Sequence, residues 1–218
     1  MRTKMIKHGL ERFENERLLV KALHETKTYY RPLDPGSYLY NKICNYDISS
    51  KFSTDFIELL YVTLAAWNMN SRGAKLQEYC KFEKSIIDNK DNIYSIADLN
   101  IKEISEETSM NQIEELFYSL DLVANTKPAL VTFTKTMHFL LPELVVPIDR
   151  TYTLMYFYEN VNIPKEKEKQ FAMIKEIQCE FSKFANKISM DKYIDKKWNR
   201  TAAKVMDNMI IGYKRMHR

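Results

Sequence analysis

The chain has 218 residues, of which 45% are hydrophobic, 12% aromatic and 28% charged. This length can bury a sizeable core without disulfides or a structural metal, and the composition excludes extensive disorder. The formal net charge of +4 defines no partner by itself, but residues 1–31 and 192–218 each carry eight Lys/Arg against four and two Asp/Glu. These basic ends suit either a bound polyanion or ordinary solvated helix faces.

The cysteines and the apolar runs indicate the cellular compartment of the protein. Cys44, Cys80 and Cys179 are far apart and form no CxxC pair, so we expect reduced thiols rather than a disulfide framework or a zinc site. The N-terminal MRTKMIKHGLERFENER contains no apolar signal-peptide region, and prolines interrupt the longest apolar run, 137–148. We therefore expect a cytoplasmic protein without a membrane anchor.

Only 4 Gly and 6 Pro are present, which favours long helices joined by short loops over many strands. Hydrophobic periodicity, capping residues and prolines predict helices over 5–30, 37–46, 53–68, 74–88, 93–99, 106–123, 126–141, 149–160, 164–189 and 192–216. The stretch 53–68 is apolar nearly all round, so we expect it to be the central helix. Pro164 suits the first turn of the helix over 164–189.

The sequence thus predicts an all-α, multi-helix globular fold. It forms either a single domain over 1–218 or two helical lobes, 1–50 plus 126–218 and 51–125, with a cleft between them. Residues 88–121 are acidic, with nine Asp/Glu against two Lys.

Chemistry is most strongly indicated by residues 130–158, LVTFTKTMHFLLPELVVPIDRTYTLMYFY. Lys135 lies in an apolar helical stretch, and Asp149 follows it after a proline-containing loop. Apolar surroundings favour the neutral amine of a lysine, which is a usable nucleophile, and a facing carboxylate could steer it. Asp149 is also typical of a helix N-cap, and that reading needs no catalysis.

This arrangement resembles the helix-hairpin-helix DNA glycosylase superfamily, whose members have a hairpin, a lysine, an apolar helix and a P-x-x-D or P-x-D segment leading into another helix. The matching pieces are residues 134–136 (TKT), 137–141 (MHFLL) and 146–149 (VPID). The resemblance implies that Asp149 is the catalytic aspartate and that Lys135 is the lysine that attacks C1′ of the nucleotide.

The hairpin of this resemblance is degenerate. The superfamily's L-P-G-V-G positions read LVTFT at 130–134, without either glycine. Alignment on Leu130 places Thr136, rather than Lys135, at the catalytic lysine's position. The same stretch, together with WNMNSRGAK at 67–75, also resembles a widespread group of uncharacterised microbial proteins.

The resemblance implies a DNA glycosylase-like enzyme that flips a modified or damaged base out of duplex DNA and excises it. Either Lys135 or a water activated by Asp149 is the nucleophile, without any metal or organic cofactor. The residues expected to complete the site are Trp67 or Tyr61 as walls of the base pocket, and Arg72, Lys75, Arg150 and Lys204 as phosphate or DNA contacts.

Two other readings stay open at this stage. The chain could be a non-catalytic helical module that binds nucleic acid or a protein, with Asp149 serving only as a cap. It could also be a helical enzyme acting on a small anion held by the turn at 72–75, where free N–H groups and positive charge would meet. His138 has no Cys or His partner nearby, so we expect a packed or partly exposed histidine rather than a ligand or base.

Overall fold

The computed structural model describes residues 2–29, 34–70, 75–105, 107–124, 127–195 and 197–217. Within these ranges the protein is all-α, as the sequence predicts, and the only extended pairing is an isolated antiparallel bridge between Leu76 and Val123. The α-helices are α1 (Arg2–Glu11), α2 (Glu16–Tyr29), α3 (Pro35–Ile43), α4 (Thr54–Leu64), α5 (Tyr79–Asp88), α6 (Lys90–Tyr94), α7 (Ser109–Ser119), α8 (Leu130–Leu140), α9 (Met155–Tyr158), α10 (Lys167–Lys187) and α11 (Ala202–Met216).

Side-chain caps start several of these helices. Asp34 accepts a hydrogen bond from the backbone N–H of Ser37 at the start of α3, and Ser53 does the same for Phe56 at the start of α4. Each cap satisfies one of the N–H groups that have no partner in the first turn of a helix. These two helices therefore begin close to where the sequence predicts.

The expected helix over 5–30 is wrong, because the chain breaks into α1 and α2. The 3₁₀ turn η1 (Arg12–Glu14) follows α1 and buries Phe13, and Asn15 then has an extended backbone. The Oδ1 of Asn15 accepts hydrogen bonds from the backbone N–H groups of Arg17 and Leu18, so Asn15 starts a new helix rather than continuing the old one.

Several other helices begin later than predicted; α7, for example, begins at Ser109 rather than 106, and α8 at Leu130 rather than 126. The C-terminal helix, α11, begins at Ala202 rather than 192. Asp195 Oδ1 accepts hydrogen bonds from the backbone N–H groups of residues 197–199, which form a turn, and Thr201 then caps α11. Helix α10 begins at Lys167, so Pro164 lies before it rather than in its first turn. Helix α5 begins at Tyr79, after the bridge at Leu76; residue 74, the predicted start, lies outside the described residues.

The central helix is α8, which corrects the prediction for 53–68. Every residue of α8 is buried, including Lys135 and His138. In α4, by contrast, Val62 is 53% exposed, and one face of that apolar helix stays at the surface. Composition pointed to the wrong helix because α8 contains polar side chains, and their hydrogen-bond partners come from other segments: Thr134 Oγ1 accepts the N–H of Ile148, for example.

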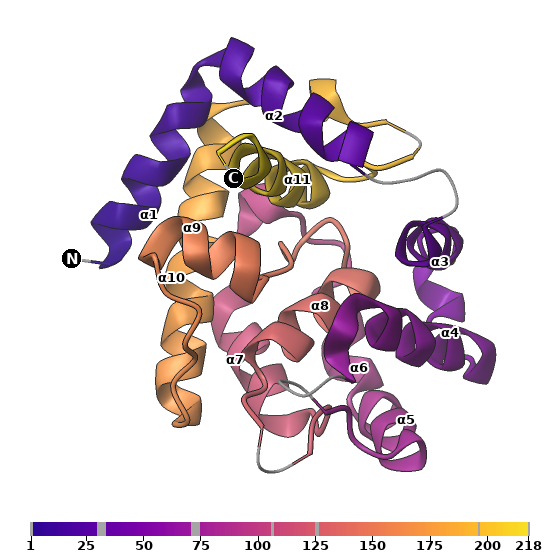
Figure 1. The fold of residues 1–218 in the computed structure, drawn as a ribbon. Helices are drawn as coiled ribbons and strands as arrows, with labels where there is room; N and C mark the ends of the chain where they lie inside the picture. The colour runs from indigo at the N-terminus through magenta and orange to yellow at the C-terminus, as the bar shows by residue number, and fades with distance from the viewer. Residues whose placement is uncertain are drawn as a thin grey trace.

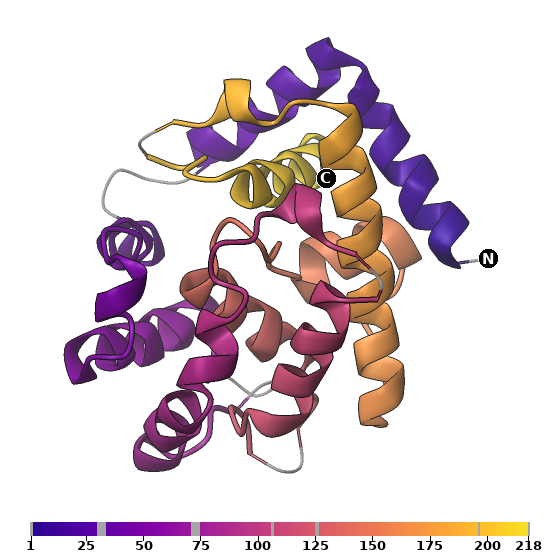
Figure 2. The ribbon, with the colours of Figure 1, turned by 180° about the vertical axis from the view of Figure 1, so that it is seen from behind.

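The two ends of the chain pack together. Figures 1 and 2 show α2 lying along α11, and α1 beside α10 and α9, on one side of α8, while α3, α4 and α5 lie on its other side. The approach of α2 to α11 is close, since a Cβ on Gly212 would overlap the backbone carbonyl of Ala22. The hydroxyl of Thr26 also donates to the carbonyl oxygen of Asn208, 2.6 Å away.

Candidate functional site

A lysine and an aspartate meet where α8 faces the loop that precedes η5 (Arg150–Leu154), a π-helical turn. The Nζ of Lys135 lies 3.0 Å from Oδ2 of Asp149, and the two side chains are 7% and 27% exposed. Lys135 lies in the middle of α8, and the fully buried Thr136 next to it points into the core. The structure therefore pairs Lys135, not Thr136, with Asp149.

Asp149 is both a helix cap and an ion-pair partner. Its Oδ1 accepts the backbone N–H groups of Thr151 and Tyr152, while its Oδ2 binds Lys135. Burial alone would raise the pKa of Asp149, but the charge of Lys135 and these hydrogen bonds outweigh burial and hold that pKa below its ordinary value. The carboxylate is therefore ionised at neutral pH and fixed in orientation.

The ring of Trp67 lies close to two lysine ammonium groups. Trp67 lies in the π-helical turn η3 (Ala65–Met69) that follows α4, and its ring centroid is 5.6 Å from the Nζ of Lys135 and 5.1 Å from the Nζ of Lys204. Its ring also stacks on Tyr40, at 5.8 Å between centroids. Both ammonium groups are within the distance at which a cation is attracted to an aromatic ring.

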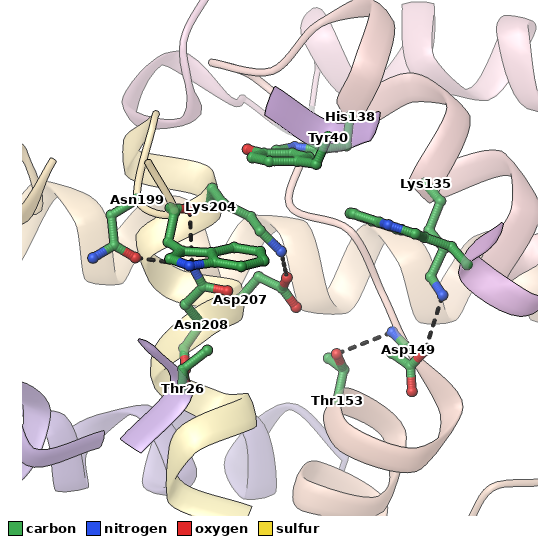
Figure 3. Close-up of polar contacts among 12 residues, drawn as sticks. Thr26, Tyr40, Lys135, His138, Asp149, Thr153, Asn199, Lys204, Asp207 and Asn208 are labelled. Carbon is green, nitrogen blue, oxygen red and sulfur yellow. Dashed lines mark hydrogen bonds and ion pairs between the residues drawn. The ribbon is translucent and has the colours of Figure 1, made fainter. Parts of the chain in front are cut away.

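Lys204 brings a second ion pair to the same place. Its ammonium contacts the carboxylate of Asp207, three residues further along α11, and the two side chains are only 3% and 5% exposed. Burial raises the pKa of Asp207, an effect that the charge of Lys204 opposes and that of Asp149 reinforces. In Figure 3 the two pairs come to one region from different elements, Lys204 and Asp207 from α11, and Lys135 from α8.

Both pairs line one cavity of about 500 Å³. This volume is within the range of ~300–1,000 Å³ typical of sites for small molecules. Aromatic side chains make up much of the wall, among them Trp67, Tyr152 and Trp198. The cavity thus combines aromatic surfaces with two ammonium groups and three carboxylates, the third being that of Asp34, which is a suitable lining for a planar polar molecule.

A smaller cavity of about 220 Å³ shares Trp67, Asn68 and Asp149 with the first. Asn68 has a φ of 64°, in the left-handed region, which is strained for a residue other than glycine. Arg150 lines the smaller cavity, and its Nε donates to the carbonyl oxygen of Val161, 2.9 Å away. Asp149 therefore lies where the two cavities meet.

The remaining predicted residues lie elsewhere. Tyr61 does not line either cavity: its hydroxyl donates to the carbonyl of Gln77, and its ring packs on Tyr79 and Phe82. Lys75 is exposed, and Arg72 lies outside the described residues. Of the residues expected to contact phosphate, Lys204 is buried in the cavity wall rather than presented to a DNA backbone.

Of the two environments expected for His138, packed or partly exposed, the structure shows the packed one. His138 is fully buried, and Nδ1 lies 2.8 Å from the carbonyl oxygen of Val145, which can only accept, so Nδ1 carries the hydrogen. The Nε2 atom can then accept from the hydroxyl of Tyr40, at 3.4 Å. Burial lowers the pKa of His138 to about 3, so the ring is neutral at physiological pH.

Asp207 is the residue that the sequence analysis missed. A signal for it exists in AAKVMDNMII, residues 202–211, where a lysine and an aspartate three positions apart interrupt an apolar run. That spacing puts both charges on one face of a helix. Within the described ranges, no group of three or more His, Cys, Asp or Glu side chains could hold a metal ion.

Comparisons with protein-family models, curated proteins and solved structures found no match to this chain. The described helices include none with both the length and the apolar character needed to cross a bilayer. The structure itself shows an all-α fold with a cavity lined by two Lys–Asp pairs, one buried and one partly exposed, and by a tryptophan.

Proposed function

We propose that this protein is a DNA glycosylase-like enzyme that excises a modified or damaged base from duplex DNA. The observation that carries the proposal is the 3.0 Å contact between Lys135 and Asp149 in the wall of a cavity that Trp67 also lines. A nucleophile, a carboxylate and an aromatic wall around one cavity are what base excision requires.

The segment aligned with the hairpin is helical here. Residues 130–134 form the first part of α8, and the connection from α7 to α8 runs through 120–129. The proposal therefore rests on the lysine, the aspartate and the cavity, and the hairpin contributes nothing to it.

In the proposed reaction a flipped nucleotide places its base in the 500 Å³ cavity and its C1′ beside Asp149. The bond between C1′ and the base nitrogen breaks, and its electron pair leaves with the base. The ionised carboxylate of Asp149 stabilises the positive charge that develops on the sugar. The departing base takes a proton from the ammonium of Lys135, which becomes a neutral amine.

That amine then forms a new bond to C1′ and loses a proton to solvent. The C1′–O4′ bond next breaks with its electron pair on O4′, which takes a proton from solvent, while the nitrogen lone pair forms the C=N bond of a protonated Schiff base. If water rather than Lys135 attacks C1′, Asp149 accepts the proton of the water, and the products are the free base and an abasic site. In both branches Asp149 is indispensable, while Lys135 forms a covalent adduct only in the first.

Borohydride trapping tests the proposal. The protein is incubated with duplexes that each contain one modified base or an abasic site, borohydride is added, and both adducts and released bases are measured. We expect an adduct that Lys135→Ala abolishes, and base release that Asp149→Asn reduces by about 100-fold or more. Lys84→Ala is the charge-matched control, because Lys84 is exposed and paired with Asp88 on α5.

The alternative function is a non-catalytic helical binding module, which the capping role of Asp149 favours. It predicts neither adduct nor base release from any duplex, and a DNA affinity that Asp149→Asn leaves unchanged. That combination of results would refute the enzyme.

A further inference from the structure

The reaction proposed above gives no role to the most deeply buried charges of the cavity, those of Lys204 and Asp207. Burying an ion pair removes two charges from water, and apolar residues of similar volume often stabilise a protein as well or better. The pair is therefore not explained by a gain in the free energy of unfolding. Its position in the cavity wall, beside Trp67 and Trp198, points to a ligand instead.

Both partners have hydrogen-bonding capacity left over. Asp207 Oδ2 binds the ammonium of Lys204, and among the described residues Oδ1 has no hydrogen-bond partner. The ammonium of Lys204 has three N–H groups, and within the same described part of the chain Asp207 is the one acceptor that it contacts. Its other neighbours are the rings of Tyr40 and Trp67. A free acceptor therefore lies beside free donors in the cavity wall.

We infer that Lys204 and Asp207 recognise the hydrogen-bonding edge of an uncharged nucleobase in this cavity. The carboxylate of Asp207 accepts a ring N–H, and the ammonium of Lys204 donates to the neighbouring carbonyl oxygen. The inference rests on the proposed function in identifying the occupant as a base. The inference adds the class of base that binds. The base has a free hydrogen-bonding edge, as products of deamination or ring oxidation do, and bases that are alkylated or bridged at that edge are excluded.

Matched pairs of methylated bases test this inference without any catalysis. In 1-methyluracil the N3–H and carbonyl edge is free, whereas in 1,3-dimethyluracil a methyl group blocks it; 9-methylhypoxanthine and 1,9-dimethylhypoxanthine form the equivalent purine pair. The chain has 2 tryptophans, Trp67 and Trp198, and both line the cavity. Their indole N–H resonances in a two-dimensional NMR titration therefore report binding at this site.

We expect the free-edge base of each pair to bind at least about tenfold more tightly than its blocked partner, since a good bidentate contact discriminates by that factor or more. The ratio should fall close to one in Lys204→Met and in Asp207→Leu, because neither methionine nor leucine can bond to that edge. Lys51→Met is the control, because Lys51 is another buried lysine but bonds to the carbonyl of Leu140 outside the cavity. It should retain the tenfold ratio.

If a single variant fails to fold, the double variant Lys204→Met/Asp207→Leu replaces it, since it leaves no unpaired buried charge. Equal binding of free-edge and blocked bases, no indole shift with either free-edge base, or a ratio retained in the folded pair variant would each overturn the inference. The probes cannot react, so the result is independent of trapping. A tenfold ratio without any adduct or base release would uphold the base site and refute the enzyme.

Discussion

Asp149 holds Lys135 with one carboxylate oxygen while the other oxygen caps a helical turn. The Nζ of Lys135 is 3.0 Å from Oδ2, and Oδ1 accepts the N–H groups at the start of η5. A cap fixes the position of the carboxylate, and a fixed carboxylate can stabilise charge without reorganising. The two interpretations that the sequence left open, a cap and a member of a reactive pair, therefore describe one side chain.

Substitutions of Asp149 separate these two roles. Asparagine is as good an N-cap as aspartate, so Asp149→Asn should retain the cap and lose only the charge, whereas Asp149→Ala should lose both. We expect Asp149→Ala to be less stable than Asp149→Asn by ~1 kcal/mol, measured by urea unfolding, and base release to be lost in both. Equal stabilities of the two variants would show that the cap contributes nothing.

The removal of one partner also leaves the other charge buried. Lys135 is 7% exposed, so the double variant Lys135→Met/Asp149→Asn should be more stable than the sum of the single substitutions predicts. A double-mutant cycle in urea measures this coupling. Strict additivity would mean that the pair makes no net interaction in the folded state.

His138 should make the protein sensitive to acid. Burial lowers its pKa to about 3, while the unfolded value is the ordinary 6.5, so between these limits the unfolded chain binds more protons. The free energy of unfolding should therefore fall as the pH falls from 6.5 towards 3, by on the order of 4 kcal/mol for this residue. Urea unfolding across this range should give a shallower pH dependence for His138→Gln than for the native sequence.

Lys51 should act in the alkaline range with the same sign as His138, because the folded state depresses the pKa of both bases. Burial lowers its pKa to about 8, and its Nζ donates to the carbonyl oxygen of Leu140, 2.8 Å away, at the end of α8. Above pH 8 the folded lysine is neutral while the unfolded one stays charged up to about pH 10.5, so its contribution to stability rises with pH. The unfolding free energy of the native sequence minus that of Lys51→Met should therefore become more positive from pH 8 to pH 10. A constant difference would contradict this assignment.

Gly212 is required by the packing of α2 on α11. A Cβ at this position would overlap the backbone carbonyl of Ala22, which cannot move without separating the two helices. We expect Gly212→Ala to destabilise the protein by about 3 kcal/mol, measured by urea unfolding. Gly9→Ala is the matched control: its Cβ would approach only the Phe157 and Tyr156 rings, at 3.1 Å and 3.2 Å, and rings can shift. Similar losses in both variants would mean that the α2–α11 contact is not the cause.

Local chemistry made several features predictable. The apolar periodicity, together with caps such as Asp34 and Ser53, specifies helices, because these signals act within a few residues of the chain. These features follow from local chemistry alone. The sequence also places Lys135 and Asp149 in one segment, but Lys135 lies in the middle of α8, so whether the two side chains face each other depends on how α8 packs.

Burial, however, is a property of what packs against an element. The helix over 54–64 is the more apolar one, yet α8, with its threonines, Lys135 and His138, is central, because other parts of the chain supply its hydrogen-bond partners. Lys204 and Asp207 join Lys135 and Asp149 only because α2 and α11, from opposite ends of the chain, pack together and bring the start of α11 over Trp67. Contacts between residues so distant in sequence leave no local signal, because they depend on how the whole fold packs.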